Sequence, residues 1–92
     1  MSEHRKSVHV KIEGRVQGVW YRGWTVKTAC RLGLDGWVRN QADGSVEAVF
    51  SGTPASVDTM IERCRRGPPA ADVRAIHESP FEGSVPEGFH QR

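Results

Sequence analysis

The stretch Val8-His-Val-Lys-Ile-Glu-Gly-Arg-Val-Gln-Gly-Val-Trp-Tyr-Arg22 decides the fold that we expect for this chain. Its first residues alternate between apolar and polar side chains, which is typical of a half-buried β-strand. Gly14 and Gly18 then interrupt the strand, and apolar residues at helical spacing follow over residues 22–32. The stretch therefore predicts a strand that passes through a glycine-containing loop into a helix.

The middle of the chain predicts a β-hairpin followed by a second helix. Residues 34–40 and 44–50 have strand character, and a short Asp-Gly turn joins them. Thr53 and Pro54 are typical of the first residues of a helix, and apolar residues at positions i, i+3, i+4 and i+7 follow. We expect this helix to stop at Gly67.

The two ends of the chain are expected to differ from the middle. Residues 72–76 alternate and predict a fourth strand. Residues 79–92 are rich in Pro, Gly and Glu, and we expect them to form a surface loop with Phe89 as an apolar anchor. Residues 1–7 are expected to form a flexible N-terminal tail.

The predicted order of elements is strand, helix, strand, strand, helix, strand. This βαββαβ order is the split βαβ, or ferredoxin-like, order of an α+β protein, with an antiparallel sheet and two helices on one face. A chain of 92 residues has room for one hydrophobic core, so residues 1–92 are expected to form a single domain. Many unrelated functions use this fold, so the function must be argued from individual residues.

The composition is that of a folded, water-soluble protein. Hydrophobic residues make up 37% and charged residues 26% of the chain, and the net charge is +2. This charge is too small to indicate a nucleic-acid-binding protein, although it suits a small anionic substrate. No apolar run approaches the ~20 residues that cross a bilayer, and no secretory signal is visible, so we expect a cytoplasmic protein.

Cysteine, histidine and tryptophan residues do not indicate a metal site or a catalytic triad. Cys30 and Cys64 lie on the apolar stripes of the predicted helices, and we expect buried free thiols, with thiol chemistry as the less favoured alternative. Neither cysteine is part of a CxxC motif, and the four histidines are scattered. Trp20, Trp24 and Trp37 are expected to pack against other residues.

The glycine-containing loop is the first candidate for a functional site. A loop between a strand and a helix can turn several backbone N–H groups toward one point, where the helix N-terminus adds positive charge. Such a site suits a phosphate-like anion, and the planar guanidinium of Arg22 matches two phosphoryl oxygens. The alternative is a glycine-rich turn followed by a surface arginine, and the spacing alone favours that alternative.

Asn40 is the second candidate. It has the strand parity of Val38, which is expected to face the core, so Asn40 is expected on the inward face near the end of its strand. An amide there can hold a water molecule because it both donates and accepts hydrogen bonds. Equally, Asn40 could simply shape the hairpin turn with Asp43 and Gly44.

Two segments resemble the signatures of a known family. Gly14-Arg-Val-Gln-Gly-Val-Trp-Tyr-Arg22 closely resembles the first signature of the acylphosphatases, and Gly36-Trp-Val-Arg-Asn40 resembles the second. Two motifs in the right order, with the expected elements between them, are far more specific than either alone. The similarity, which is to small bacterial-type members, covers nearly the whole chain, from about Val8 to Phe89.

The resemblance implies a small hydrolase without metal or cofactor. It would cleave the carboxyl–phosphate bond of acyl phosphates and release a carboxylate and inorganic phosphate. Arg22 would bind the phosphoryl group, and Asn40 would orient the attacking water. The backbone amides that the resemblance assigns to phosphate binding are those of Arg15, Val16, Gln17, Gly18 and Val19.

The sequence departs from the family pattern in two places. Gln41 stands beside Asn40 where many members have a hydroxyl residue. The C-terminal Phe89-His-Gln-Arg92 is more polar than the apolar-alternating terminal strand that is common in the family, so we expect a weaker edge strand.

Other functions stay open beside this interpretation. A non-enzymatic anion- or RNA-binding module could use the same fold, although the relevant strands offer only Trp37 and Phe50 as aromatic residues. The chain could also be the acylphosphatase-like part of a larger carbamoyl-transfer system, but its length favours a free-standing protein. The acylphosphatase interpretation predicts a monomer that binds a small acyl phosphate and has no nucleic-acid or membrane partner.

Overall fold

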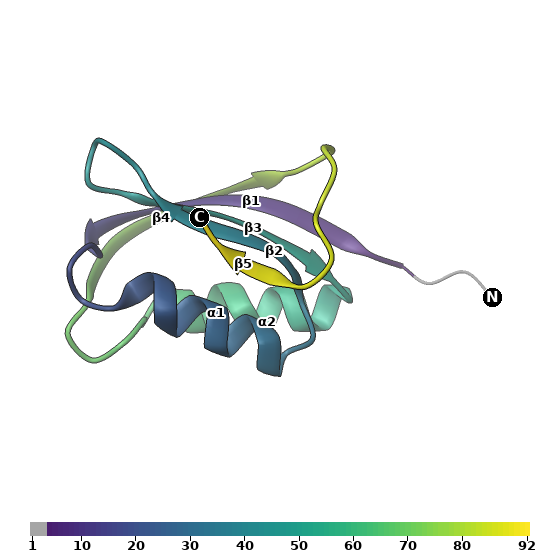
Figure 1. Cartoon of the computed structure of the whole chain (residues 1–92), viewed down its shortest axis with the longest axis horizontal. Helices are drawn as coiled ribbons and strands as arrows, with labels where there is room; N and C mark the ends of the chain where they lie inside the picture. The colour runs from purple at the N-terminus through teal and green to yellow at the C-terminus, as the bar shows by residue number, and fades with distance from the viewer. Residues whose placement is uncertain (1–3) are drawn as a thin grey trace.

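The computed structural model describes residues 4–92, which form a β-sheet with two helices on one of its faces (Figure 1). The sheet has the strand order β4-β1-β3-β2-β5. The predicted ferredoxin-like order is confirmed, with one additional strand at the C-terminal end. In chain order the elements are β1 (Lys6–Arg15), α1 (Tyr21–Arg31), β2 (Asp35–Asn40), β3 (Val46–Gly52), α2 (Pro54–Cys64), β4 (Asp72–Pro80) and β5 (Phe89–Gln91).

The sheet is mixed, whereas the sequence predicted a purely antiparallel one. The pairs β1–β3, β1–β4 and β2–β3 are antiparallel, but β5 lies parallel to β2. Residues 81–88 return the chain from β4 to the far edge of the sheet, where the Gly36 N–H donates to the Gly88 carbonyl at 2.9 Å. The Gly88 N–H in turn donates to Asp35 Oδ1 at 2.8 Å, which fixes the start of β5.

The C-terminal segment is therefore not only a loop. β4 continues to Pro80, and Phe89–Gln91 form β5. The expectation that Phe89 anchors this segment is confirmed, because its side chain is buried and its ring stacks on Phe50 with the centroids 5.4 Å apart. This aromatic contact supplies the apolar burial that the polar terminal sequence lacks.

The N-terminal strand is longer than its sequence pattern indicates. β1 begins at Lys6, and Lys6 and Ser7 pair with Gly52 and Ser51, so these two residues belong to the sheet rather than to a flexible tail. Strand pairing is made by backbone groups, so the strand can begin before the first residue of the apolar alternation, Val8. Residues 1–3 of the expected tail lie outside the described residues.

The hydrophobic core lies between the sheet and the helices. The alternation predicted for β1 is confirmed, because every second side chain of this strand is buried on the side of the helices. Val46, Ala48 and Phe50 of β3 are buried in the same core. The register pairs Val8 with Phe50, Val10 with Ala48, and Ile12 with Val46.

Helix α1 buries its predicted apolar stripe only in part, because Ala29 is buried and Val26 is partly buried against the core. Its buried residues are Tyr21, Thr25, Thr28 and Ala29. The Tyr21 hydroxyl donates to the Cys64 carbonyl at 2.6 Å and so ties α1 to the end of α2. With Tyr21 facing inward, Cys30 is turned outward, and the prediction that Cys30 is buried is wrong.

Helix α2 follows its sequence pattern closely. Thr53 Oγ1 accepts from the Ser56 N–H at 3.3 Å, and Pro54 is the first helical residue. Cys64 is buried as predicted, and burial raises the pKa of its thiol to about 12. Among residues 4–92, no helix is long and apolar enough to cross a bilayer.

Candidate active site

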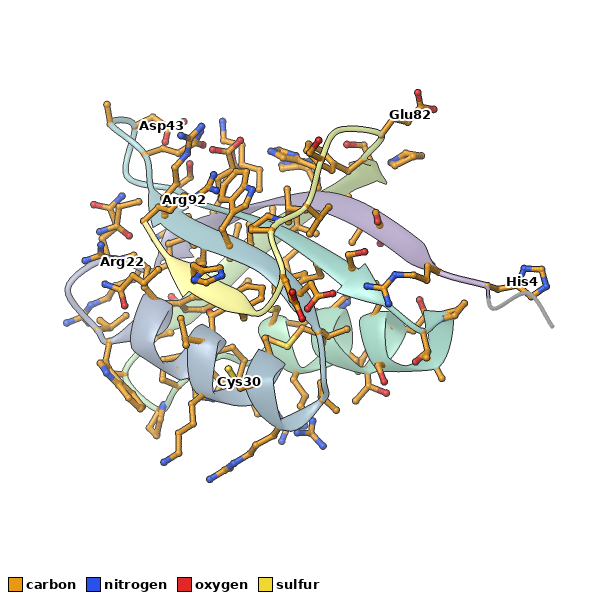
Figure 2. The ribbon with its side chains drawn as sticks, turned by 45° about the vertical axis from the view of Figure 1, so that its right-hand side comes forward. His4, Arg22, Cys30, Asp43, Glu82 and Arg92 are labelled. Atoms are coloured by element: carbon orange, nitrogen blue, oxygen red, sulfur yellow. The ribbon has the colours of Figure 1, made fainter. Side chains whose placement is uncertain are left out.

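A cavity of about 260 Å³ lies where the β1–α1 loop, the start of α1, the end of β2 and β5 meet. It brings Arg22 and Asn40 together, as the sequence predicted, although the two residues come from different elements. Figure 2 shows Arg22 and the C-terminal Arg92 on the same side of the molecule. The cavity is lined by Val16, Gly18, Trp20, Tyr21, Arg22, Gly23, Asn40 and Gln91.

A larger cavity, of about 350 Å³, lies near the end of α2. It is lined by Trp24 and Gly67 together with charged side chains of the helix end. None of the residues predicted for the site lines it, and neither does the glycine-containing loop. We therefore place the candidate active site in the smaller cavity.

The loop that follows β1 has alternating signs of φ, as in an anion-binding nest. Gly18 has φ 75° and Trp20 has φ 68°, whereas the intervening Val19 does not have positive φ, so the sign of φ alternates. Alternation of this kind turns successive N–H groups toward one side of the backbone. Helix α1 starts at the next residue, without a side-chain cap or an acidic residue in its first turn.

Arg22 lies in the first turn of α1 and is half-buried. A cation there is unfavourable with respect to the helix dipole, which makes the N-terminus of α1 positive. Among residues 4–92, no acidic side chain forms a salt bridge with Arg22. Its guanidinium is therefore available to an anion that enters the cavity.

Asn40 is the last residue of β2, where it pairs with Val46 of β3. The sequence left open whether Asn40 only shapes the hairpin turn. The side-chain hydrogen bonds within this turn come instead from Gln41, Asp43 and Ser45. Asn40 Oδ1 is buried without a hydrogen-bond partner among residues 4–92, and Asn40 lines the cavity. A buried acceptor without a donor is uncommon and points to a functional role.

Gln17 connects the loop to the β2–β3 hairpin. Its side-chain Nε2 donates to the Gln41 carbonyl at 2.8 Å and to the Ser45 carbonyl at 2.9 Å. The sequence suggested only a backbone role for Gln17 and did not predict this side-chain contact. The sequence signal that could have predicted this contact is the side-chain amide of Gln17, which carries two N–H donors in a loop that is otherwise apolar or glycine.

Two further lining residues were missed. Gln91 reaches the cavity because β5 forms, where the polar terminal sequence indicated only a weak edge strand. Trp20 was expected to pack against other residues, but the residue is 62% exposed at the cavity, and its indole lies against Gly23 and not in the core. The left-handed backbone of Trp20 directs the chain into α1 and leaves the indole outside the core.

Tyr21 lines the cavity but does not offer a base. Burial, and to a smaller extent the contact with Cys64, raises the pKa of its hydroxyl. The hydroxyl therefore stays protonated and donates to the Cys64 carbonyl. Among residues 4–92, no three His, Cys, Asp or Glu side chains gather as they would around a metal ion. What the cavity offers is a cation, backbone donors and one unpaired amide oxygen.

Comparison with known proteins gives consistent matches. Residues 8–91 match the sequence profile of the family described as Acylphosphatase. An acylphosphatase of Rhodospirillum rubrum is 54% identical over 87 residues, which cover 95% of this chain and 96% of the relative. An acylphosphatase of Rhizorhabdus wittichii is 56% identical over 87 residues, which cover 95% of this chain and 86% of the relative.

Solved structures agree with the sequence matches. The structure of an acylphosphatase from Coxiella burnetii superposes on this chain with a TM-score of 0.91 at 34% sequence identity. The superposition covers 96% of this chain and 93% of that chain.

Proposed function

This chain belongs to the acylphosphatase family, and we propose that it uses Arg22 and Asn40 to hydrolyse the carboxyl–phosphate bond of acyl phosphates. The products are a carboxylate and inorganic phosphate. One observation carries the proposed roles: a single cavity holds an arginine without an acidic partner and a buried amide oxygen without a donor.

Arg22 and the loop hold the phosphoryl group in this mechanism. The guanidinium binds two phosphoryl oxygens, and the backbone N–H groups of residues 15–19 and the N-terminus of α1 bind the rest of the negative charge. An acyl phosphate has a weakly basic carboxylate as its leaving group, so positioning and charge stabilisation provide most of the catalysis. Donors that are fixed before the reaction stabilise the transition state without reorganisation.

Asn40 orients the nucleophile. Its Oδ1 accepts a hydrogen bond from a water molecule and aims the water oxygen at phosphorus, opposite the departing carboxylate. The new P–O bond forms as the bond to the carboxylate oxygen breaks, and the water proton passes to a phosphoryl oxygen of the substrate. This route needs no base from the protein, which fits the protonated state of Tyr21.

The experiment is phosphate release from benzoyl phosphate in the presence of EDTA, for the wild type and for Arg22→Lys. We expect the wild type to remain active, because no step in the mechanism uses a metal ion. Arg22→Lys keeps the charge but loses the planar pair of donors, so kcat/KM should fall about 100-fold or more and inhibition by phosphate should weaken.

Arg31→Lys is the matched control, since Arg31 is exposed in the last turn of the same helix and does not line the cavity. It should behave as the wild type. Loss of wild-type activity with EDTA that a divalent ion restores would contradict the metal-independent mechanism. Normal kinetics of a folded Arg22→Lys would remove Arg22 from the site.

We propose a cytoplasmic monomer that binds a small acyl phosphate and no nucleic acid. Trp37 is covered by Arg39 and Arg92, and Phe50 is buried, so neither ring is available to stack on a base. Both cysteines are free, which suits a reducing compartment. Light scattering after size exclusion tests the monomer, which more than one subunit per particle would contradict.

A further inference from the structure

The indole of Trp20 lies at the candidate active site, outside the hydrophobic core. Among residues 4–92, Trp20 is the one large apolar side chain that is exposed, at 62%. The same residue lines the cavity that holds Arg22 and Asn40. A single exposed apolar side chain is normal on a protein surface. The backbone and the surroundings of Trp20, however, are not those of an ordinary surface residue.

Trp20 has a left-handed backbone conformation, which is sterically unfavourable for a bulky residue. Its φ of 68° and ψ of 25° are left-handed, and no other non-glycine residue in the described part of the chain has positive φ. A bulky residue is an outlier in this region, where glycine and asparagine are tolerated. Trp20 is also the N-cap of α1, where Ser, Thr, Asp or Asn would supply a hydrogen bond that the indole does not make. Strain of this kind persists mainly at functional sites.

Gly23 fixes the position of the indole. A Cβ atom at Gly23 would lie 2.1 Å from Trp20 Nε1 and 2.6 Å from Cε2, so the ring rests directly on the backbone of the first helical turn. A side chain at position 23 would displace the ring. The indole is therefore an apolar surface with a fixed position beside the cavity.

We propose that Trp20 is the acyl-group subsite of this enzyme and favours flat, aromatic acyl groups. The inference rests on the proposed function, in which the loop and Arg22 hold the phosphoryl end of the substrate. The acyl group then has to extend out of the cavity, and the other apolar lining residues, Val16 and Tyr21, are buried. The indole is thus the exposed apolar surface that the acyl group meets, and aromatic rings stack favourably on it.

The test compares kcat/KM for benzoyl phosphate with kcat/KM for acetyl phosphate in the wild type, Trp20→Gly and Trp20→Phe. Glycine removes the ring and accepts the left-handed backbone, whereas phenylalanine keeps an aromatic surface. We expect the benzoyl-to-acetyl ratio to fall roughly three- to tenfold in Trp20→Gly and to be largely retained in Trp20→Phe. Trp24→Phe is the matched control, because Trp24 lies one turn along the same helix and does not line this cavity.

The ratio separates a subsite from a structural role. A displaced loop would lower kcat/KM for both substrates by the same factor, and it would also weaken inhibition by inorganic phosphate, which has no acyl group. Hydrolysis of both substrates with an unchanged ratio in Trp20→Gly would overturn the subsite and leave the proposed function intact. Failure of the wild type to hydrolyse either substrate would overturn the proposed function, and the subsite with it.

Discussion

Asn40 has a buried side-chain oxygen for which residues 4–92 supply no hydrogen-bond donor. At the scale of one residue, such an atom can lower stability while serving activity. An unpaired buried polar atom costs about 1–3 kcal/mol when its hydrogen bonds to water are lost on folding. Nothing in the fold requires this cost, because the adjacent turn is held by Asp43 and Ser45. The proposed use of Asn40 Oδ1 is to bind the attacking water.

We therefore predict opposite effects of Asn40→Ala on activity and stability. If Oδ1 orients water, kcat should fall by roughly two to three orders of magnitude, as when one preorganised polar group is removed from a hydrolytic site. KM and inhibition by phosphate should stay close to the wild type, because Arg22 and the loop bind the phosphoryl group. The free energy of unfolding, measured by urea denaturation, should not decrease, because the unpaired acceptor is gone.

Three results would contradict this role of Asn40. A folded Asn40→Ala with normal kcat would remove Asn40 from the mechanism. A raised KM with normal kcat would instead assign Asn40 to substrate binding. A loss of stability with normal kcat would identify Asn40 as a hairpin residue.

Single residues were predicted from the sequence with uneven success, for physical reasons. The inward orientation of Asn40 follows from strand alternation, which depends only on neighbouring residues. The orientation of Cys30 does not follow from neighbouring residues. It depends on the rotation of α1, which is set by the hydrogen bond from Tyr21 to Cys64, and these two residues are 43 positions apart in the chain. The exposure of Trp20 depends on a left-handed backbone that the residue type does not favour.

At the scale of elements, the active site depends on a contact between the β1–α1 loop and the β2–β3 hairpin. Gln17 makes this contact with two hydrogen bonds to backbone carbonyls. The hairpin positions Asn40, and the loop is proposed to position the phosphate-binding amides. We therefore propose that Gln17 positions the loop relative to the hairpin, and with it the two halves of the candidate site.

Gln17→Ala should weaken phosphate binding more than it slows the chemical step. Two lost hydrogen bonds should lower the free energy of unfolding by about 1–3 kcal/mol. At a temperature where the variant is fully folded, KM for benzoyl phosphate and the inhibition constant for phosphate should both rise, because the loop is less fixed. Steady-state kinetics with phosphate as inhibitor measure both quantities.

Gln41→Ala is the matched control for Gln17. The side chain of Gln41 forms hydrogen bonds with Glu47 and Ser45 within the hairpin. Gln17 contacts the backbone carbonyl of Gln41 and not its side chain. This variant should lose stability without a change in phosphate inhibition. Equal effects of the two variants on phosphate inhibition would show that the hairpin, and not the contact through Gln17, positions the loop.

Elements were predicted best where a local pattern determines them. The cap and proline at the start of α2 and the alternation in β1 were predicted correctly. Strand β5 could not be read from its own residues, because its formation depends on Asp35 and Phe50, which come from other strands. Gln91 was missed at the site for the same reason.

For the whole molecule, the order of elements was enough to predict the fold, but not the distances within it. Gly36 illustrates the difference, since its φ is 138° and a Cβ atom there would lie 1.8 Å from the Val49 carbonyl oxygen. The motif identifies this glycine, but only the packed sheet shows that β3 approaches it so closely. The cavity itself arises from four segments that meet after folding.

Two carboxylates on the sheet and hairpin are expected to make the stability of the whole molecule depend on pH. Hydrogen bonds from Ser45 and Lys11 hold the pKa of Asp43 well below its usual value. Burial alone would raise the pKa of Glu47, but hydrogen bonds from His9 and Arg39 outweigh it and lower the pKa. Both groups therefore favour the ionised form more strongly in the folded than in the unfolded state.

The sign of the pH dependence follows from these lowered pKa values. Below the ordinary carboxyl pKa of about 4, the unfolded chain binds protons that the folded protein does not, so acid favours unfolding. The stabilisation is fully present above that pKa and is lost as the pH falls toward the lower pKa of the folded state. We predict that the free energy of unfolding, from urea titrations, decreases as the pH falls from about pH 5 to pH 2.

Asp43→Asn tests whether this network is the source of the acid sensitivity. Asparagine keeps an oxygen that accepts from the Ser45 N–H, as Asp43 Oδ1 does at 2.9 Å, but it does not titrate. The variant should therefore lose less stability than the wild type between about pH 5 and pH 2, where the unfolded chain takes up protons that the folded protein does not. Glu82→Gln, in the exposed loop after β4 (Figure 2), is the control and should keep the wild-type slope. An unchanged slope in Asp43→Asn would show that the acid sensitivity arises elsewhere in the molecule.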